Sequence, residues 1–215
     1  MKNQLAIAFV SFALLTSSRA GEWSAPEFCH GSPCPEYALV ENHGAFEERY
    51  YNSSLWLETP VQSTAYSDVA LGFGRLYRFA SGSDENGECA RLPLTAPAIV
   101  LSSRSDSGET RVSTAIFVPP DTELPKPGDP SVMVVLKSGG TVYVRVFGGL
   151  PTESIVLDNM RQLQKDLMDA GKLQDPHRFV GAGYAPSATL LQGHNEVWVF
   201  GDAAALADAG SNVAQ

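Results

Sequence analysis

The sequence contains few of the residues that usually support catalysis or metal binding. It has four histidines and three cysteines in 215 residues. No nucleophile elbow, phosphate-binding loop, HExxH motif or paired CxxC motif is present, so the enzyme classes that these motifs define are not indicated. The cysteines are scattered and only His30 lies beside one of them, so neither zinc nor another metal is expected. We therefore expect a protein that is not an enzyme.

Long apolar runs are also absent. The longest, Leu5 to Leu15, has eleven residues, whereas a membrane-spanning helix needs about 20. Lys2 precedes this run and the small residues Ser18 and Ala20 follow it, which is the order of segments in a secretory signal peptide. We expect residues 1–20 to be cleaved off, and the mature chain to be secreted without membrane insertion. The alternative is a buried N-terminal helix.

Basic residues are scarce, with 15 lysines and arginines against 24 aspartates and glutamates. Removal of residues 1–20 takes away Lys2 and Arg19 and no acidic residue, which leaves a net charge of about −11. A negative field of this size repels nucleic acids and anionic membrane surfaces, so neither is expected as a partner. The remaining length suits one large domain or two small ones, with a sizeable core. No linker is long enough to favour two, so we expect one domain, and we expect it to be a monomer.

Secretion bears on the cysteines and on one asparagine. An oxidising compartment permits one disulfide among Cys29, Cys34 and Cys89. The sequence does not choose the pair, but Cys34 with Cys89 is favoured over Cys29 with Cys34, because it closes a loop of more than about 50 residues. Asn52-Ser53-Ser54 is a sequon, so Asn52 is a candidate glycosylation site.

Hydrophobic periodicity and turn residues predict two helices and nine short strands. The first helix runs from Asp68, which is expected to cap it, to Ala80, with Val69, Phe73, Leu76 and Ala80 facing inward. The second runs from Glu153 to Ala170 and stops at Gly171. The predicted strands span residues 37–41, 46–51, 55–59, 94–101, 110–118, 132–136, 141–147, 178–184 and 195–200.

Pro119 to Pro130 is rich in proline and predicts an extended crossover between two halves. Each half reads strand, strand, helix, strand, strand, which is typical of the α+β class. We expect a distorted antiparallel β-barrel of two halves related by a pseudo-twofold axis, each with one long helix. Residues 21–36 are then an N-terminal extension, 37–200 the domain, and 201–215 a disordered tail.

Two carboxylates are candidates for chemistry. Glu196 stands beside the apolar run Val197 to Phe200, which favours a buried acid that hydrogen-bonds to Asn195 or to backbone. The alternative is a general base in an apolar cavity, and Glu48 is the second candidate for that role. Trp56 and Trp198 are expected in the core. The four histidines, His30, His43, His177 and His194, are expected at surface positions in loops or at strand ends rather than as ligands.

Six short motifs follow one another along the chain. They are Phe46-Glu47-Glu48-Arg49-Tyr50-Tyr51 followed by Trp56, Leu94-Thr95-Ala96-Pro97, Pro125 to Pro130, Val144-Arg145-Val146-Phe147-Gly148-Gly149, Ala182-Gly183-Tyr184 and Asn195-Glu196-Val197-Trp198. In this order they resemble the SOUL heme-binding protein family, and the resemblance covers about Pro35 to Phe200. It is greatest to secreted, heme-binding protein 2-like members, which share a Cys-Pro pair before the first strand, here Cys34-Pro35.

The resemblance implies a barrel of the regulatory-factor effector-binding type and non-covalent binding of heme in a shallow apolar groove beside the first helix. A tetrapyrrole is a flat apolar plate with two carboxylates, so it fits an apolar surface that has a guanidinium at its edge. A histidine proposed as an iron ligand in some members falls at Tyr50, and a lysine near the propionates falls at Thr189. The residues implied for the groove are Ala70, Phe73, Gly74 and Tyr77, with Arg78 near the propionates.

These observations together predict a secreted carrier or scavenger of heme or another tetrapyrrole. The ligand is expected to be held mainly by apolar contact. The alternatives are a small-molecule hydrolase of the same barrel superfamily and an extracellular interaction module without a ligand.

Overall fold

The computed structural model describes residues 23–81, 92–105, 107–124, 129–172, 175–184 and 193–201. The predicted signal peptide and nearly all of the predicted tail lie outside these residues. Within the described part, no helix is long and apolar enough to cross a membrane. The elements are η1 (Glu27–Cys29), β1 (Tyr37–Asn42), β2 (Glu47–Tyr51), β3 (Ser54–Val61), α1 (Tyr66–Ala80), β4 (Ala98–Arg104), β5 (Thr110–Val118), β6 (Met133–Lys137), β7 (Gly140–Phe147), α2 (Glu153–Asp169), β8 (Arg178–Gly183) and β9 (Asn195–Phe200).

The strands form one antiparallel sheet whose order is symmetric. That order is β1-β2-β7-β9-β8-β4-β5-β3-β6. The β4–β8 pair joins two similar sets of four strands, and β1 adds a ninth strand beside β2. On one side of this pair, β4-β5-β3-β6 carries α1, and on the other, β8-β9-β7-β2 carries α2. The predicted α+β barrel of two related halves is confirmed. The spatial sets differ from the sequence halves by one strand each. β2 comes from the first half of the sequence but lies in the set with α2, and β6 comes from the second half but lies in the set with α1.

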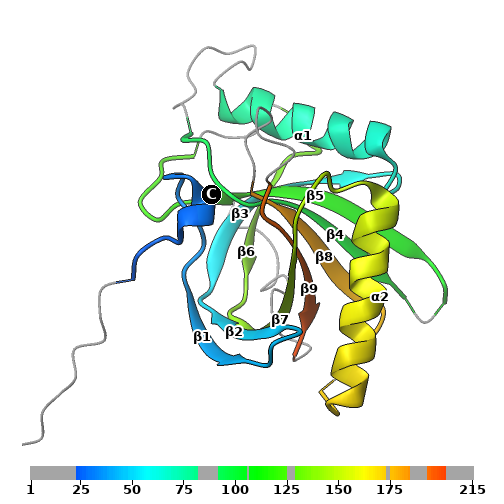
Figure 1. Ribbon diagram of the computed structural model, residues 1–215. Coiled ribbons are helices and arrows are strands. Elements are labelled where there is room, and N and C mark those ends of the chain that lie inside the picture. Colours follow the sequence, from blue (N-terminus) through cyan, green and yellow to red (C-terminus); the bar gives the residue numbers. More distant parts are fainter. Residues whose placement is uncertain are drawn as a thin grey trace, which may run out of the picture.

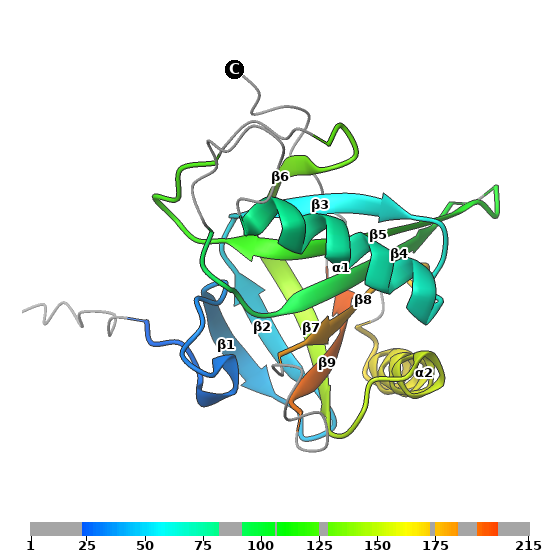
Figure 2. The same cartoon turned by 90° about the horizontal axis from the view of Figure 1, so that it is seen from above.

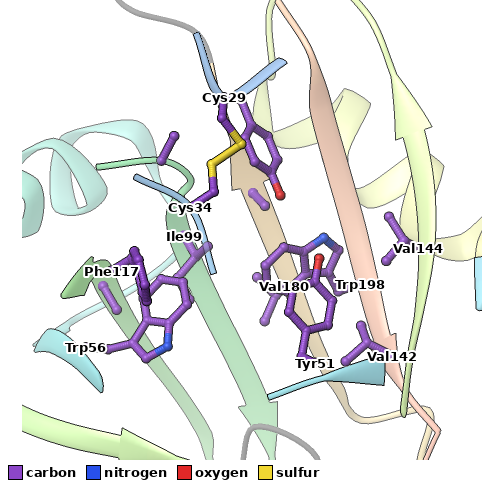
Figure 3. Close-up of a cluster of buried hydrophobic side chains, with 14 of the residues drawn as sticks. Cys29, Cys34, Tyr51, Trp56, Ile99, Phe117, Val142, Val144, Val180 and Trp198 are labelled. Atoms are coloured by element: carbon purple, nitrogen blue, oxygen red, sulfur yellow. A yellow bond between two sulfur atoms is a disulfide. The ribbon is translucent and has the colours of Figure 1, made fainter. Parts of the chain in front are cut away.

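The sheet curls into a half-barrel, and both helices lie against its convex side (Figures 1 and 2). Alternate residues of each strand therefore belong to different cores. Trp56 and Trp198 are fully buried on the concave side, as Figure 3 shows. Their neighbour Leu57 packs under α1, and Val197 packs under α2. The expected core position of both tryptophans is confirmed.

A disulfide-bonded segment closes one end of the half-barrel. The pairing of Cys34 with Cys89 is wrong, because Cys34 is bonded to Cys29. The turn after η1 passes through His30 and Gly31, both at positive φ, and reverses the chain, so the Cα atoms of the two cysteines lie 6.3 Å apart. Both cysteines are buried in the concave core, above Trp198 in Figure 3. Cys89 lies outside the described residues.

Two predicted element boundaries are wrong for local reasons. Helix α1 begins at Tyr66 rather than at Asp68, and the Asp68 carboxylate accepts a hydrogen bond from Ser63 Oγ at 2.6 Å instead of capping the helix. Strand β4 begins at Ala98 rather than at residue 94, because Pro93 and Pro97 lack the N–H that a central strand must donate.

Replacement of Gly72 by alanine should lower the free energy of unfolding by about 1–2 kcal/mol. A Cβ at Gly72 would lie 2.5 Å from Thr114 Oγ1 and 2.6 Å from Val61 Cγ1. Overpacking of this kind costs about 1–3 kcal/mol, which exceeds the roughly 1 kcal/mol that alanine gains over glycine in a helix.

The matched control is Gly74→Ala, in the same helix, where a Cβ would meet no atom within 4 Å. This change should raise the free energy of unfolding by about 0.5–1 kcal/mol. Urea denaturation followed by circular dichroism measures both variants. Effects of the same sign would contradict the close approach of α1 to β5.

Candidate functional site

The residues implied for a ligand groove share one face of α1. Ala70, Gly74, Tyr77 and Arg78 are exposed, and Phe73 is half-buried at the edge of the core beneath the helix. Space around Gly74 is open, since a Cβ there would meet nothing within 4 Å. The structure therefore brings the five residues together as a strip along the outer face of α1.

Aromatic rings form the apolar part of this strip. The centroids of Phe73 and Tyr77 lie 6.1 Å apart, with the ring planes inclined by 31°. Partial burial raises the pKa of the Tyr77 phenol above its usual value, which further disfavours its ionised form. Phe73 packs in the same cluster as Val134 of β6, and Leu136 is exposed on that strand. A flat apolar ring system fits a surface of this composition.

Two arginines of α1 have different roles. Arg75 turns back to the sheet, where Nε donates to Thr59 Oγ1 at 3.1 Å and Nη2 donates to the Pro60 carbonyl at 2.6 Å. Arg78 is exposed in the last turn. The pKa of nearby Asp129 is lowered, mainly by hydrogen bonds from Ser131, with smaller contributions from both arginines. Arg78 can therefore offer a guanidinium to a ligand carboxylate at the end of the strip.

The described residues of α1 include no histidine. The four histidines lie after η1, between β1 and β2, before β8 and before β9, at loop or strand-end positions as expected. Tyr50, which matches the proposed iron ligand by motif, lies on β2 and is 49% exposed, whereas α1 packs on β3 and β5. Thr189 lies outside the described residues. The strip thus combines two aromatic rings with an exposed arginine, and α1 contains no imidazole.

Glu196 is fully buried on the concave side of the sheet, where side chains surround its carboxylate. The expected bond to Asn195 or to backbone is wrong, because the Asn195 amide donates to the Gly149 carbonyl at 2.8 Å instead. Sequence reasoning missed the partners of Glu196, which come from three separate parts of the chain. At Oε1 they are Arg49 Nη1 (3.0 Å) and His194 Nε2 (2.7 Å), and at Oε2 they are Tyr184 Oη (2.9 Å) and Trp198 Nε1 (2.7 Å).

The charges of Arg49 and Glu196 stabilise each other. Burial on its own raises the pKa of Glu196, but hydrogen bonds and the Arg49 charge outweigh it and lower that pKa. Burial likewise lowers the pKa of Arg49, and the charge of Glu196 reverses this effect. The pKa of the Tyr184 phenol is raised by burial first and by Glu196 second. The site therefore holds an ionised pair among neutral phenols.

This arrangement disfavours Glu196 as a general base. A buried base needs a raised pKa and an oxygen within reach of a substrate proton, whereas the pKa of Glu196 is lowered and each oxygen already has two partners. Glu48, the other candidate, lies outside the concave core and accepts a hydrogen bond from Lys172 at 2.8 Å. That bond is the main reason why the pKa of Glu48 is lowered.

The N-terminal segment covers the Glu196 network. The Phe28 ring stacks on His194, with centroids 3.9 Å apart and planes at 4°, and meets Tyr184 edge-on at 4.8 Å. The Arg49 guanidinium lies 4.4 Å from the centre of the Tyr37 ring. These contacts fasten the disulfide-bonded segment over this end of the barrel, so the network connects two parts of the structure rather than lining an open site.

A hollow of about 590 Å³ lies toward the opposite ends of the strands. Glu58 and Lys137 form a buried ion pair there at 2.6 Å, and Ser113 Oγ donates to Glu58. The Arg178 guanidinium lies 4.0 Å from the centre of the Phe200 ring. The sequence signal for this site is weak. It consists of one charged residue, Glu58, two positions after Trp56 in a mostly apolar strand, so that both side chains point to the same face of the sheet.

Asn52 is exposed in the turn between β2 and β3. Its backbone N–H donates to the Glu36 carbonyl at 3.2 Å. The next residue, Ser53, accepts a hydrogen bond from the Gly139 N–H through its hydroxyl. The asparagine side chain of the sequon is thus accessible, as a glycosylation site requires.

Comparison with known proteins gives consistent matches. The sequence profile described as "SOUL heme-binding protein" matches residues 32–200. Heme-binding protein 2 of Mus musculus is 28% identical over 182 residues, covering 82% of this chain and 83% of the relative. The Homo sapiens protein of the same name is 26% identical over the same length and coverage.

Among solved structures, the C-terminal domain of EcmrR superposes with a TM-score of 0.54 at 12% identity, covering 76% of this chain and 96% of that chain. EcmrR in a DNA complex gives a TM-score of 0.55 at 10% identity, covering 71% of this chain and 55% of that chain. At such low identity these two likenesses concern the fold alone.

Replacement of Glu196 by glutamine should lower the free energy of unfolding by about 3–5 kcal/mol, because it leaves the buried charge of Arg49 without its closest buried partner. The matched control is Glu47→Gln. Glu47 contacts the same guanidinium at 2.7 Å but is partly exposed, so its loss should cost less than about 1 kcal/mol. Urea denaturation measures both changes.

If Glu196→Gln does not fold, Tyr184→Phe replaces it, since this change removes a single donor from Glu196 Oε2. The expected loss is about 1–3 kcal/mol. Equal effects of Glu47→Gln and of the buried change would contradict the anchoring role of Glu196.

Proposed function

Because this chain belongs to the SOUL heme-binding protein family, we propose that it binds heme or a related tetrapyrrole non-covalently on the outer face of α1. The observation that carries the proposal is the strip itself. Phe73 and Tyr77 offer two neighbouring rings, Gly74 leaves open space beside them, and Arg78 lies at the end of the strip. The named relatives are heme-binding proteins, and they support this choice of ligand.

Apolar contact supplies most of the binding free energy in this proposal. Each 100 Å² of apolar surface removed from water contributes about 2.5 kcal/mol, and a tetrapyrrole is flat enough to lie along the strip. Arg78 pairs with a propionate, which offsets locally the repulsion between a dianionic ligand and a mature chain of net charge about −11. With no imidazole on α1, the heme is held by its ring and its propionates.

Secretion gives this binding its role, that of an extracellular carrier or scavenger. Three features support it. The first 20 residues have the pattern of a signal peptide. The Cys29–Cys34 disulfide suits an oxidising compartment. The sequon asparagine Asn52 is exposed, as an extracellular glycoprotein requires.

Hemin titration of the mature chain, followed at the Soret band, tests the ligand and the site. The unmodified protein should bind one hemin saturably. Gly74→Leu should weaken binding at least about tenfold, because it fills the open part of the strip with a side chain that meets no neighbouring atom at its Cβ. Arg78→Gln should weaken binding about three- to tenfold through loss of the charged partner.

The control is Arg178→Gln, in the hollow on the concave side, which should leave hemin affinity unchanged within about twofold. Absence of a saturable Soret shift would refute tetrapyrrole binding. A loss of affinity in Arg178→Gln with none in Gly74→Leu would refute the site on α1 and place the ligand in the hollow.

Expression of the full chain in secreting eukaryotic cells tests the extracellular role. The protein should accumulate in the medium with Gly21 as its first residue, because signal peptidase cuts after small residues such as Ser18 and Ala20. Glycosidase treatment should reduce its apparent mass, and Asn52→Gln should abolish that difference. Retention in the cell with Met1 intact would contradict secretion.

A further inference from the structure

The turn between β1 and β2 gathers three potential metal ligands on the outside of the sheet. Glu41, His43 and Glu48 each offer one ligand atom, and these atoms all lie within 4.8 Å of one another. His43 Nε2 lies 3.6 Å from Glu41 Oε2 and 3.5 Å from Glu48 Oε2. The cluster is separate from the α1 strip, from the hollow and from the Glu196 network.

Two features of the cluster favour a cation. Glu41 and Glu48 are direct cross-strand partners, and like charges in that position destabilise a sheet, an effect that Lys172 offsets in part at Glu48. His43 Nε2 is buried, and its distances of 3.5 and 3.6 Å to the two carboxylates are too long for a strong hydrogen bond. An ion between the three groups would neutralise the carboxylates and give Nε2 a closer partner.

Local structure holds the histidine in place. The backbone N–H of His43 donates to the Phe46 carbonyl at 2.9 Å. The imidazole stacks on the Phe46 ring, with the ring centroids 4.6 Å apart. The Asn42 side chain accepts a hydrogen bond from the Gly44 N–H at 2.8 Å, and Gly44 has a φ of 79°. The turn is thus tightly bonded, and the ligand atom of His43 is directed before any ion binds.

We propose that Glu41, His43 and Glu48 form a binding site for a divalent transition-metal ion of the Zn²⁺ class. In a tetrahedral zinc site, metal–ligand distances of about 2.0–2.2 Å require neighbouring ligand atoms to lie roughly 3.3–3.6 Å apart. The two histidine–carboxylate distances of 3.5 and 3.6 Å meet this requirement. The Glu41 and Glu48 ligand atoms lie within 4.8 Å of each other, and rotation of the 61% exposed Glu41 side chain can bring them to the required separation. Imidazole as a ligand selects zinc or copper over calcium or magnesium, and a fourth position remains for water or another ligand.

Lys172 sets the affinity of this site. Its ammonium donates to Glu48 Oε2 at 2.8 Å, so it competes with the ion for the same carboxylate oxygen. The backbone N–H of Lys172 is bonded to the Leu167 carbonyl, and its ammonium lies 5.7 Å from the centre of the Tyr143 ring. Removal of this positive charge should therefore strengthen metal binding. If Glu48 served only as the salt-bridge partner of Lys172, the same change would not strengthen metal binding.

Isothermal titration of the mature chain with ZnCl₂ tests the proposal without heme, so its outcome is independent of the hemin experiment. Every protein carries Cys89→Ser, because a thiolate would also bind zinc. The parent should bind one Zn²⁺. His43→Ala should weaken binding on the order of a hundredfold and Glu41→Gln about tenfold. Lys172→Met should tighten binding about three- to tenfold.

The matched control is His177→Ala, another loop histidine, which should leave zinc affinity unchanged within about twofold. CaCl₂ in place of ZnCl₂ should give no comparable binding. Substitution with Co²⁺ should produce the visible absorption of a tetrahedral site without a sulfur ligand. Thermal unfolding without metal checks that His43→Ala and Lys172→Met remain folded.

Absence of one-to-one zinc binding in the parent would overturn the proposal. Retention of binding by His43→Ala, or its loss in His177→Ala, would also overturn it by assigning the ion to another place. Unchanged or weaker binding by Lys172→Met would contradict the role of Glu48 as a ligand.

Discussion

The ion pair between Arg49 and Glu196 is the interaction on which the rest of the barrel depends. Each charge is nearly or completely buried, so each would be costly without the other. Glu196 lies on β9 and Arg49 on β2, and β7 separates these strands in the sheet. Tyr184, His194 and Trp198 donate the remaining hydrogen bonds to the Glu196 carboxylate. Aromatic rings of the N-terminal segment cover this network. One buried anion thus ties together the sheet, the chain before β1 and the start of β9.

This anchored end explains where a ligand can bind. The concave core beside the network is filled by large side chains, including Tyr51, Trp56 and Trp198, as Figure 3 shows. Large apolar ligands are therefore left with the outer surface or the open end of the barrel. The outer face of α1 combines rings, open space and an arginine, and the proposed tetrapyrrole site rests on that combination. The hollow at the other end is partly polar, with the Glu58–Lys137 pair in its wall.

The two helices pack on equivalent pairs of strands but expose different kinds of side chain. Both helices pack on a pair of strands of equivalent position, α1 on β3 and β5 and α2 on β7 and β9. The exposed face of α1 carries the apolar strip, whereas exposed positions of α2 carry ion pairs such as Arg161 with Asp158 and Lys165 with Asp169. Near the end of α2, Lys172 reaches the β1–β2 turn. The proposed tetrapyrrole and metal sites therefore lie in different halves of one fold.

The sequence by itself determined the features that depend on neighbouring residues. Hydrophobic periodicity was enough to predict nine strands and two helices. Phe73, Gly74 and Tyr77 were implied as groove residues by the resemblance to the family, and not by the spacing of apolar residues. The predicted element boundaries are wrong where a proline or a competing hydrogen bond fixes the real one, as at Pro97 and Asp68. Only the tertiary structure decided the partner of Cys34, the donors around Glu196, the hollow beside Glu58 and the meeting of His43 with Glu41 and Glu48. Each of these depends on strand register or on how a turn reverses the chain. Such long-range geometry has no periodic signal in the sequence, because it is fixed by the packing of segments far apart along the chain.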